Sequence, residues 1–199
     1  MFLLSLAAAF PAGGAYSALL FCVAKMLRDA PGYIWFDFKR KFKENVKQAA
    51  PLGIIYAAFV YTEIFLLGSL LYGGADFGAG GVVLVLSPGI VSGIVAPYIF
   101  LMVAHIDLKT SQIIKNSVLI SFSNLIRSFA GMLAGGAIWV VFFLFLPVSL
   151  VFAPVFFIFG FSLSGLLCLM WIWPPVNERF SIEKTLNDLQ LRADLKGTN

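Results

Sequence analysis

The longest stretch without a charged side chain constrains the fold of this chain more than any other feature. Residues 128–177 contain no Asp, Glu, Lys or Arg, a run of 50 residues. A helix needs about 20 apolar residues, at 1.5 Å each, to cross a hydrocarbon core of roughly 30 Å. The run therefore holds two spans. Pro147 and Pro154 predict the turn between them, because proline interrupts the helical hydrogen-bond ladder.

The other apolar stretches predict further spans. In the second predicted span, residues 51–72, Glu63 is the one charged residue. Hydrophobic residues make up 60% of the chain and charged residues 12%, against about 25% charged in soluble domains. We therefore predict an all-α polytopic membrane helix bundle with cytoplasmic amphipathic helices. Its transmembrane domain covers 1–175, and a cytoplasmic tail covers 176–199. We expect a short amphipathic helix in this tail, because Ile182, Leu186 and Leu189 recur at helical spacing with charges between them. The five predicted spans are 2–24, 51–72, 82–104, 129–147 and 153–173.

The first of these segments contains a break at Pro11–Gly14. It is either one kinked span, or a short lead followed by a helix from Ala15 to Arg28. A cleaved signal peptide is the third interpretation, and it is disfavoured because the basic n-region of such peptides is missing.

The distribution of Lys and Arg predicts the orientation in the membrane. Seven of the 14 basic residues lie between the first two segments, three between the third and fourth, and four in the tail. The other two connections carry none. We therefore expect a plasma-membrane protein with its basic loops and C-terminus in the cytoplasm. The net charge of +4 then favours contact with anionic lipid headgroups rather than with nucleic acid.

Residues 33–47 follow the helical period with two different faces. At 100° per residue, one face is aromatic and the other basic. Such a helix lies in the headgroup plane with its aromatic side down, or it serves as a docking surface for a cytoplasmic partner. The aromatic face holds Trp35, Phe38 and Phe42, and the basic face holds Arg40, Lys43 and Lys47.

A weaker version of this pattern recurs at 106–116, where Ile106–Lys109 echoes Phe36–Lys39. Both stretches follow one predicted span and precede another. Internal repeats of this kind occur in transporters, and chance combined with shared topology explains two matched charges equally well.

These same stretches resemble the YesL-like family of small bacterial membrane proteins. The resemblance is carried by Arg28–Gln48, by Pro97–Ser117 and by the proline–glycine break within Phe10–Leu19. Members of that family usually carry a further stretch before the break, which leaves the side of the membrane on which Met1 lies open. The family has no assigned function. The resemblance implies a genetic neighbourhood of carbohydrate ABC uptake and glycan degradation.

Glu63 is the one acid inside a predicted span, about 18 Å along the helix from Pro51 at 1.5 Å per residue. A charge at mid-bilayer costs about 2.5–3.5 kcal/mol on insertion scales, so such residues usually face a bundle interior or a cavity. Either Glu63 is a carboxylate linked to proton or substrate movement, or it is a hydrogen-bonded acid with Thr62 or Tyr61 as its partner.

The third span contains small residues four apart, Gly89, Gly93 and Pro97, and similar pairs occur in the last two spans, Gly131 with Gly135 and Gly160 with Ser164. Such stripes let helix backbones approach closely. The alternative is a broken helix whose freed carbonyls line a substrate path past Pro97. Asp107, just after this span, is a helix-start feature rather than a catalytic acid.

The sequence contains no phosphate-binding loop, no paired His or Cys ligands and no Ser/His/Asp ordering, so we expect neither an enzyme nor a cofactor. Two functions remain. The first is an accessory or scaffolding protein associated with ABC-type carbohydrate uptake. The second is a small self-associating transporter that moves a solute past Glu63 and the broken third span.

Overall fold

The structure, a computed structural model, describes residues 2–28, 32–72, 78–144, 146–182 and 184. Within these ranges the chain is helical and contains no strand, which confirms the predicted all-α class. The helices are α1 (Phe2–Leu27), α2 (Ile34–Tyr72), α3 (Gly78–His105), α4 (Thr110–Ser123), α5 (Leu125–Leu144) and α6 (Leu146–Phe180).

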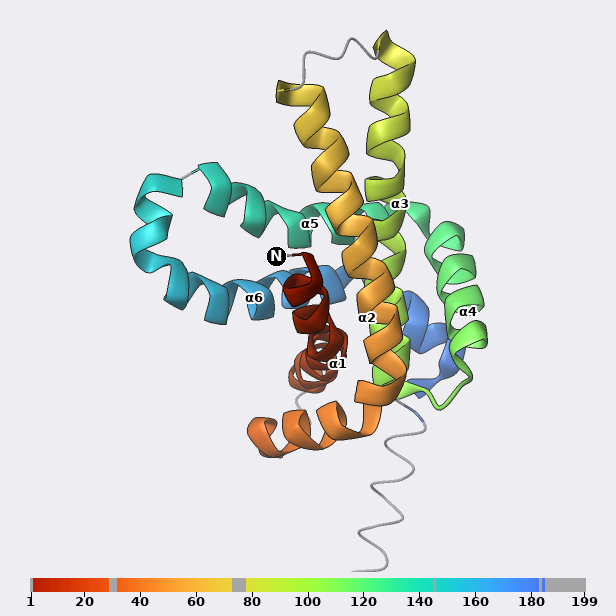
Figure 1. The fold of residues 1–199 in the computed structure, drawn as a ribbon. Helices are drawn as coiled ribbons and strands as arrows, with labels where there is room; N and C mark the ends of the chain where they lie inside the picture. The colour runs from red at the N-terminus through yellow and green to blue at the C-terminus, as the bar shows by residue number, and fades with distance from the viewer. Residues whose placement is uncertain (1, 29–31, 73–77, 145, 183, 185–199) are drawn as a thin grey trace, which may run out of the picture.

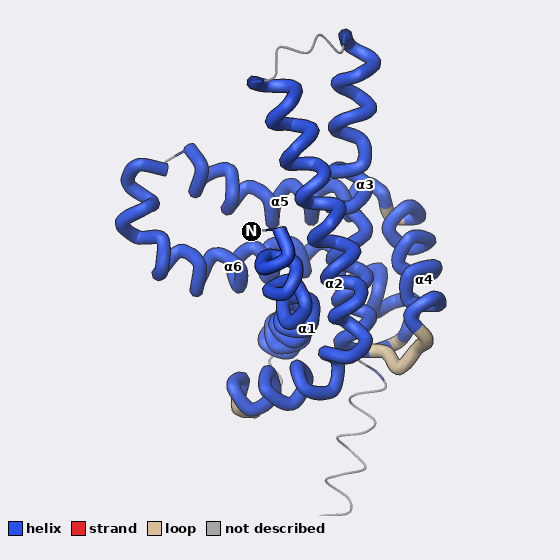
Figure 2. Tube along the Cα trace, in the orientation of Figure 1, coloured by secondary structure: helices blue, strands red, loops and turns tan. Residues whose placement is uncertain are grey.

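The helices form two long hairpins that meet at one end and diverge at the other (Figure 1). Helices α2 and α3 make the first hairpin, and α5 and α6 make the second. Helix α1 packs along α2, and α4 packs on α3. Figure 2 shows short loops before α2 and between α3 and α4, both in the lower part of the view.

Four helical segments of the described residues are long and apolar enough to cross a membrane. They are Ile34–Leu70, Gly80–His105, Leu125–Phe142 and Phe159–Phe180. The protein is therefore a multi-span helical membrane protein, and the last four predicted segments are confirmed. The predicted first span falls in α1, whose apolar stretch Pro11–Leu27 is shorter than the others. Because α1 is one helix that contains Pro11, the alternative of a separate lead before Ala15 is wrong.

The predicted amphipathic helix and the predicted second span belong to one helix, α2, with Pro51 inside it. Figure 1 shows α2 running across the base of the molecule and then turning to rise beside α3. Proline has no N–H and its ring collides with the carbonyl four residues earlier, which kinks a helix without ending it.

The predicted turn between Pro147 and Pro154 falls at the start of α6. The described residues of α5 end at Leu144 and those of α6 begin at Leu146, so both prolines lie in the N-terminal part of α6. Figure 1 shows the second hairpin reversing direction over these first turns of α6.

The hydrophobic core lies at the end where the hairpins meet, around the C-terminal half of α3. Tyr98, Leu101 and Met102 are buried there, and the Tyr98 and Ser128 hydroxyls are hydrogen-bonded at 2.9 Å. Val176 and Ile182 belong to the same core. The described part of the predicted tail is thus continuous with the transmembrane domain, and Leu186 and Leu189 lie outside the described residues.

Candidate functional site

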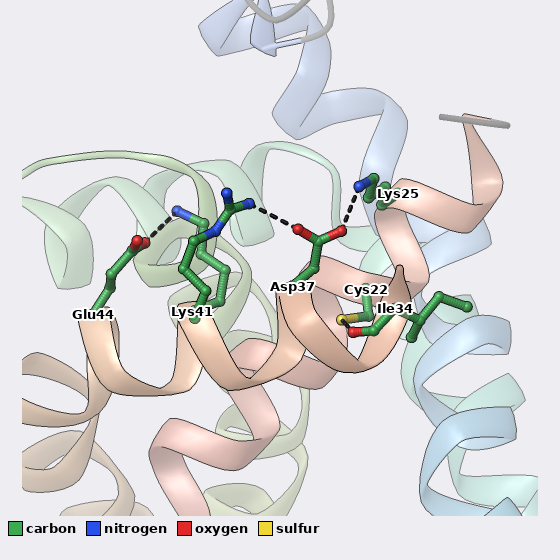
Figure 3. A network of polar contacts seen from close by, with 7 residues as sticks. Cys22, Lys25, Ile34, Asp37, Lys41 and Glu44 are labelled. Atoms are coloured by element: carbon green, nitrogen blue, oxygen red, sulfur yellow. Dashed lines mark hydrogen bonds and ion pairs between the residues drawn. The ribbon is translucent and has the colours of Figure 1, made fainter. Parts of the chain in front are cut away.

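An acidic residue that sequence reasoning did not select organises the start of α2. Asp37 is only 5% exposed. Its carboxylate forms ion pairs with Lys25 of α1 and with Arg40, whose Nη2 lies 2.8 Å away. Figure 3 shows Asp37 facing Lys25 across the two helices. An acid in the first turn of a helix also interacts favourably with the helix dipole. The sequence feature that could have identified Asp37 is a single acid in the first turn of a predicted basic helix.

Gly32 makes room for this ion pair. Its φ of +145° lies in a region that side-chain-bearing residues rarely adopt. A Cβ at this position would collide with Lys25 Nζ and lie 3.1 Å from Asp37 Oδ2. Glycine therefore fits here for two reasons, backbone conformation and space.

The predicted aromatic face packs mainly against α1 instead of turning away from the protein. Phe38 contacts the small cluster of Phe21, Cys22 and Ala104. The Phe42 ring and Val46 lie against Gly14, where an added Cβ would be 3.3 and 3.2 Å from them. Glycine at this position lets the two backbones approach, which explains why the amphipathic segment docks on α1.

Trp35 departs from the rest of the aromatic face. It is 75% exposed and stacks on Phe38 with 6.1 Å between ring centroids. Its neighbours Tyr33 and Phe36 are exposed as well. The first turn of α2 therefore presents exposed aromatic side chains on one side, while Asp37 of the same turn is buried against α1.

The predicted basic face divides into two sets of side chains. Arg40 belongs to the Asp37 ion pairs, and Lys41 pairs with Glu44 at 3.0 Å. Lys43 and Lys47 are exposed, and so is Lys39. These three residues are four apart and share one face of the helix. We call them the lysine stripe, and among the described residues none of the three has an ion-pair partner.

Glu63 makes a hydrogen bond between two spans. Its Oε1 accepts the backbone N–H of Gly89 in α3 at 2.9 Å. Pro88 lies inside α3 immediately before this residue, and proline disturbs the ladder around it. Thr62, one of the predicted partners, bonds instead to Ala58 O of its own helix at 2.9 Å. Glu63 is thus a hydrogen-bonded acid, with a partner that local sequence did not reveal.

The predicted small-residue stripes bring helices into close contact. A Cβ on Gly89 would lie 2.5 Å from Glu63 Oε1, and one on Gly135 would lie 3.1 Å from the carbonyl oxygen of Ser164. Ser164 Oγ also donates to Gly135 O at 2.8 Å. Gly160 is different, because the nearest side chain to its added Cβ is Phe156 of the same helix.

A cavity of about 580 Å³ lies between the two hairpins, lined by α1, α2, α3, α5 and α6. Pro97 is on its wall, as a substrate path past the third span requires. Glu63 is not among the lining residues. The structure therefore does not bring the two predicted transport residues together.

Asp107 lies exposed in the loop between α3 and α4. The N-cap of α4 is Lys109, whose backbone N–H donates to Gln112 Oε1 at 3.4 Å. Asp107 is thus two residues outside the helix cap. The carbonyl oxygen of its neighbour Leu108 accepts a hydrogen bond from Gln48 Nε2 of α2 at 2.7 Å. The loop is therefore tied to the lysine-bearing part of α2 through its backbone.

His105 closes the end of α3 among aromatic rings. Its Nδ1 lies 3.1 Å from Leu101 O, and its ring contacts Phe21 and Trp173 at centroid distances of 5.1 and 5.2 Å. Its buried Nε2 has no hydrogen-bond partner among the described residues. In the same part of the chain no group of three or more His, Cys, Asp or Glu side chains could hold a metal ion.

We compared the chain with known proteins. No family model, no curated protein and no solved structure matches the chain.

Proposed function

We propose that this protein is an accessory or scaffolding component of a membrane complex, and that the first part of α2 is its docking element. The observation that carries the proposal is the lysine stripe, held outward on a segment whose other sides are fixed to α1. In this proposal the stripe faces the cytoplasm, in agreement with the clustering of Lys and Arg at one end of the protein.

The docking element is held by contacts of three kinds. Asp37 joins it to Lys25 of α1, Phe38 and Phe42 pack on α1, and Gln48 bonds to the loop after α3. A surface ordered before binding loses less conformational entropy when a partner arrives. Three unpaired lysines on such a surface favour an acidic partner surface, since charge complementarity sets specificity and association rate.

The link to carbohydrate uptake rests on the resemblance to the YesL-like family. We propose that the partner is a cytoplasm-facing surface of an ABC-type uptake system. The transporter alternative requires a carboxylate on the solute path. Glu63 lies off the cavity wall and bonds Gly89, so its geometry favours a structural role.

The test is site-specific crosslinking in cells. A photoreactive residue in place of Lys43 is expected to crosslink a subunit of an ABC uptake system. The additional changes Lys39→Glu and Lys47→Glu should abolish that adduct without lowering the amount of protein in the membrane. Arg40 is left unchanged, because its reversal would place an acid beside Asp37.

The matched control reverses the exposed charges Lys115→Glu and Arg127→Glu, with the same photoreactive residue at position 43. The control should keep the adduct. Equal adducts in both variants, or a crosslink to lipid alone, would remove the support for a docking role.

A further inference from the structure

The cavity between the hairpins has the size of a ligand site. Its volume of about 580 Å³ falls within the roughly 300–1,000 Å³ range of small-molecule pockets. Glycine and alanine form much of its wall, among them Gly13, Gly53, Gly93 and Gly136. A Cβ added to Gly136 meets no atom within 4 Å, so the missing side chain there leaves part of the space open.

The lining carries no charge. Among the described residues that line the cavity there is no Asp, Glu, Lys, Arg or His. Burying an unpaired charge is costly in an apolar environment. The cavity is therefore suited to an uncharged ligand.

Two hydroxyl groups on the wall lack partners. Tyr16 and Tyr56 both line the cavity and hold their rings edge-on to Phe100, at centroid distances of 5.4 and 6.2 Å. Among the described residues neither hydroxyl makes a hydrogen bond. Neither hydroxyl oxygen is among the fully buried polar atoms of the described residues that lack a partner, so both are accessible from the cavity, where a hydroxyl or carbonyl group of a ligand can form a hydrogen bond with them.

The cavity opens along the fork between the hairpins, at the level of the apolar spans. Tyr61, Ile64 and Phe161 line it and are also exposed. Ile64 lies within the span Ile34–Leu70, and Phe161 lies within the span Phe159–Phe180. A ligand that enters here comes from the hydrocarbon layer.

We propose that this cavity binds a neutral, hydroxyl-bearing lipid, of which diacylglycerol is the simplest representative. Its acyl chain lies against the glycine and aromatic walls, and its hydroxyl and ester groups face Tyr16 and Tyr56. This site is independent of the docking element, which lies at the base of the molecule.

Gly136 offers a clean way to fill the cavity. It lines the space, and a Cβ added to it meets no atom within 4 Å. Gly136→Leu therefore occupies the cavity without a clash, and leucine is a better helix former than glycine. Gly68→Leu is the matched control, because Gly68 is also helical and open but lies outside the lining.

The experiment uses the full chain in lipid nanodiscs with a diazirine-bearing diacylglycerol as the probe. Unlabelled diacylglycerol should compete with photolabelling. Gly136→Leu should reduce labelling about tenfold, which corresponds to about 1.4 kcal/mol of binding free energy, whereas Gly68→Leu should leave it unchanged. Tyr16→Phe combined with Tyr56→Phe keeps the rings and should weaken labelling.

Three outcomes would contradict the proposal. A diazirine-bearing phosphatidic acid with the same chains should label weakly, and equal labelling would mean that the site does not select an uncharged headgroup. Protection by a neutral sugar but not by diacylglycerol would assign the cavity to a water-soluble solute. Labelling that persists in a folded Gly136→Leu protein would overturn the site itself.

Discussion

The carboxylate of Glu63 accepts the backbone N–H of Gly89 across the α2–α3 hairpin, at 2.9 Å. The two residues are 26 positions apart, and the donor follows Pro88 directly. The Glu63 carboxylate and the Gly89 N–H, both within predicted spans, thus supply each other's hydrogen-bond partner. If this bond is the role of Glu63, substitutions should change the stability of the protein according to whether they keep the acceptor, and not according to whether they keep the charge.

We expect Glu63→Gln to be tolerated and Glu63→Leu to be destabilising. Glutamine keeps a carbonyl oxygen that can accept the Gly89 N–H, whereas leucine leaves that donor unpaired, at a cost of about 1–3 kcal/mol. Thermal unfolding in detergent would measure the difference. Thr62→Val is the control, since Thr62 bonds only within its own helix. If glutamine destabilises as much as leucine, the carboxylate has a role beyond accepting this bond.

Asp37 should matter far more to stability than its neighbour Glu44. Asp37→Ala leaves Lys25 without its buried partner, and breaking a buried pair costs about 3 kcal/mol or more. Glu44→Ala removes an exposed pair with Lys41, which is worth less than about 1 kcal/mol. A comparison of melting temperatures checks this. Similar losses in the two variants would contradict the importance assigned to the Asp37 ion pairs.

Gly13 is expected to tolerate no side chain. An added Cβ would lie 2.5 Å from the carbonyl oxygen of Ala49 and 3.0 Å from Gly53 Cα, and both are backbone atoms that cannot turn aside. Gly13→Ala should lower the unfolding free energy by about 2 kcal/mol through overpacking. Gly68→Ala, with open space around it, should be neutral or slightly stabilising.

The proposed orientation can be tested with single cysteines in a background without Cys22 and Cys168. Gly80→Cys, near the connection without basic residues, should react with an impermeant thiol reagent added to intact cells. Lys43→Cys should react only after the membrane is opened, because basic segments stay in the cytoplasm. Labelling of position 43 in intact cells would reverse the orientation.

The spans followed from the sequence, because they depend on local properties. Hydrophobic length and the absence of charge decide whether a segment can cross a membrane, whatever its neighbours do. The amphipathic period of residues 33–47 is local in the same sense.

The site depended on contacts between distant parts of the chain. Arg40 and Lys43 look alike in the sequence, yet Arg40 joins Asp37 and Lys43 stays exposed. The Arg40–Asp37 pair is an i,i+3 contact that the helical period of α2 allows, whereas Lys25, 12 residues before Asp37, joins it only when α1 packs on α2. The burial of Asp37, the bond from Gly89 to Glu63 and the cavity also depend on contacts between helices. No period along one helix encodes these contacts.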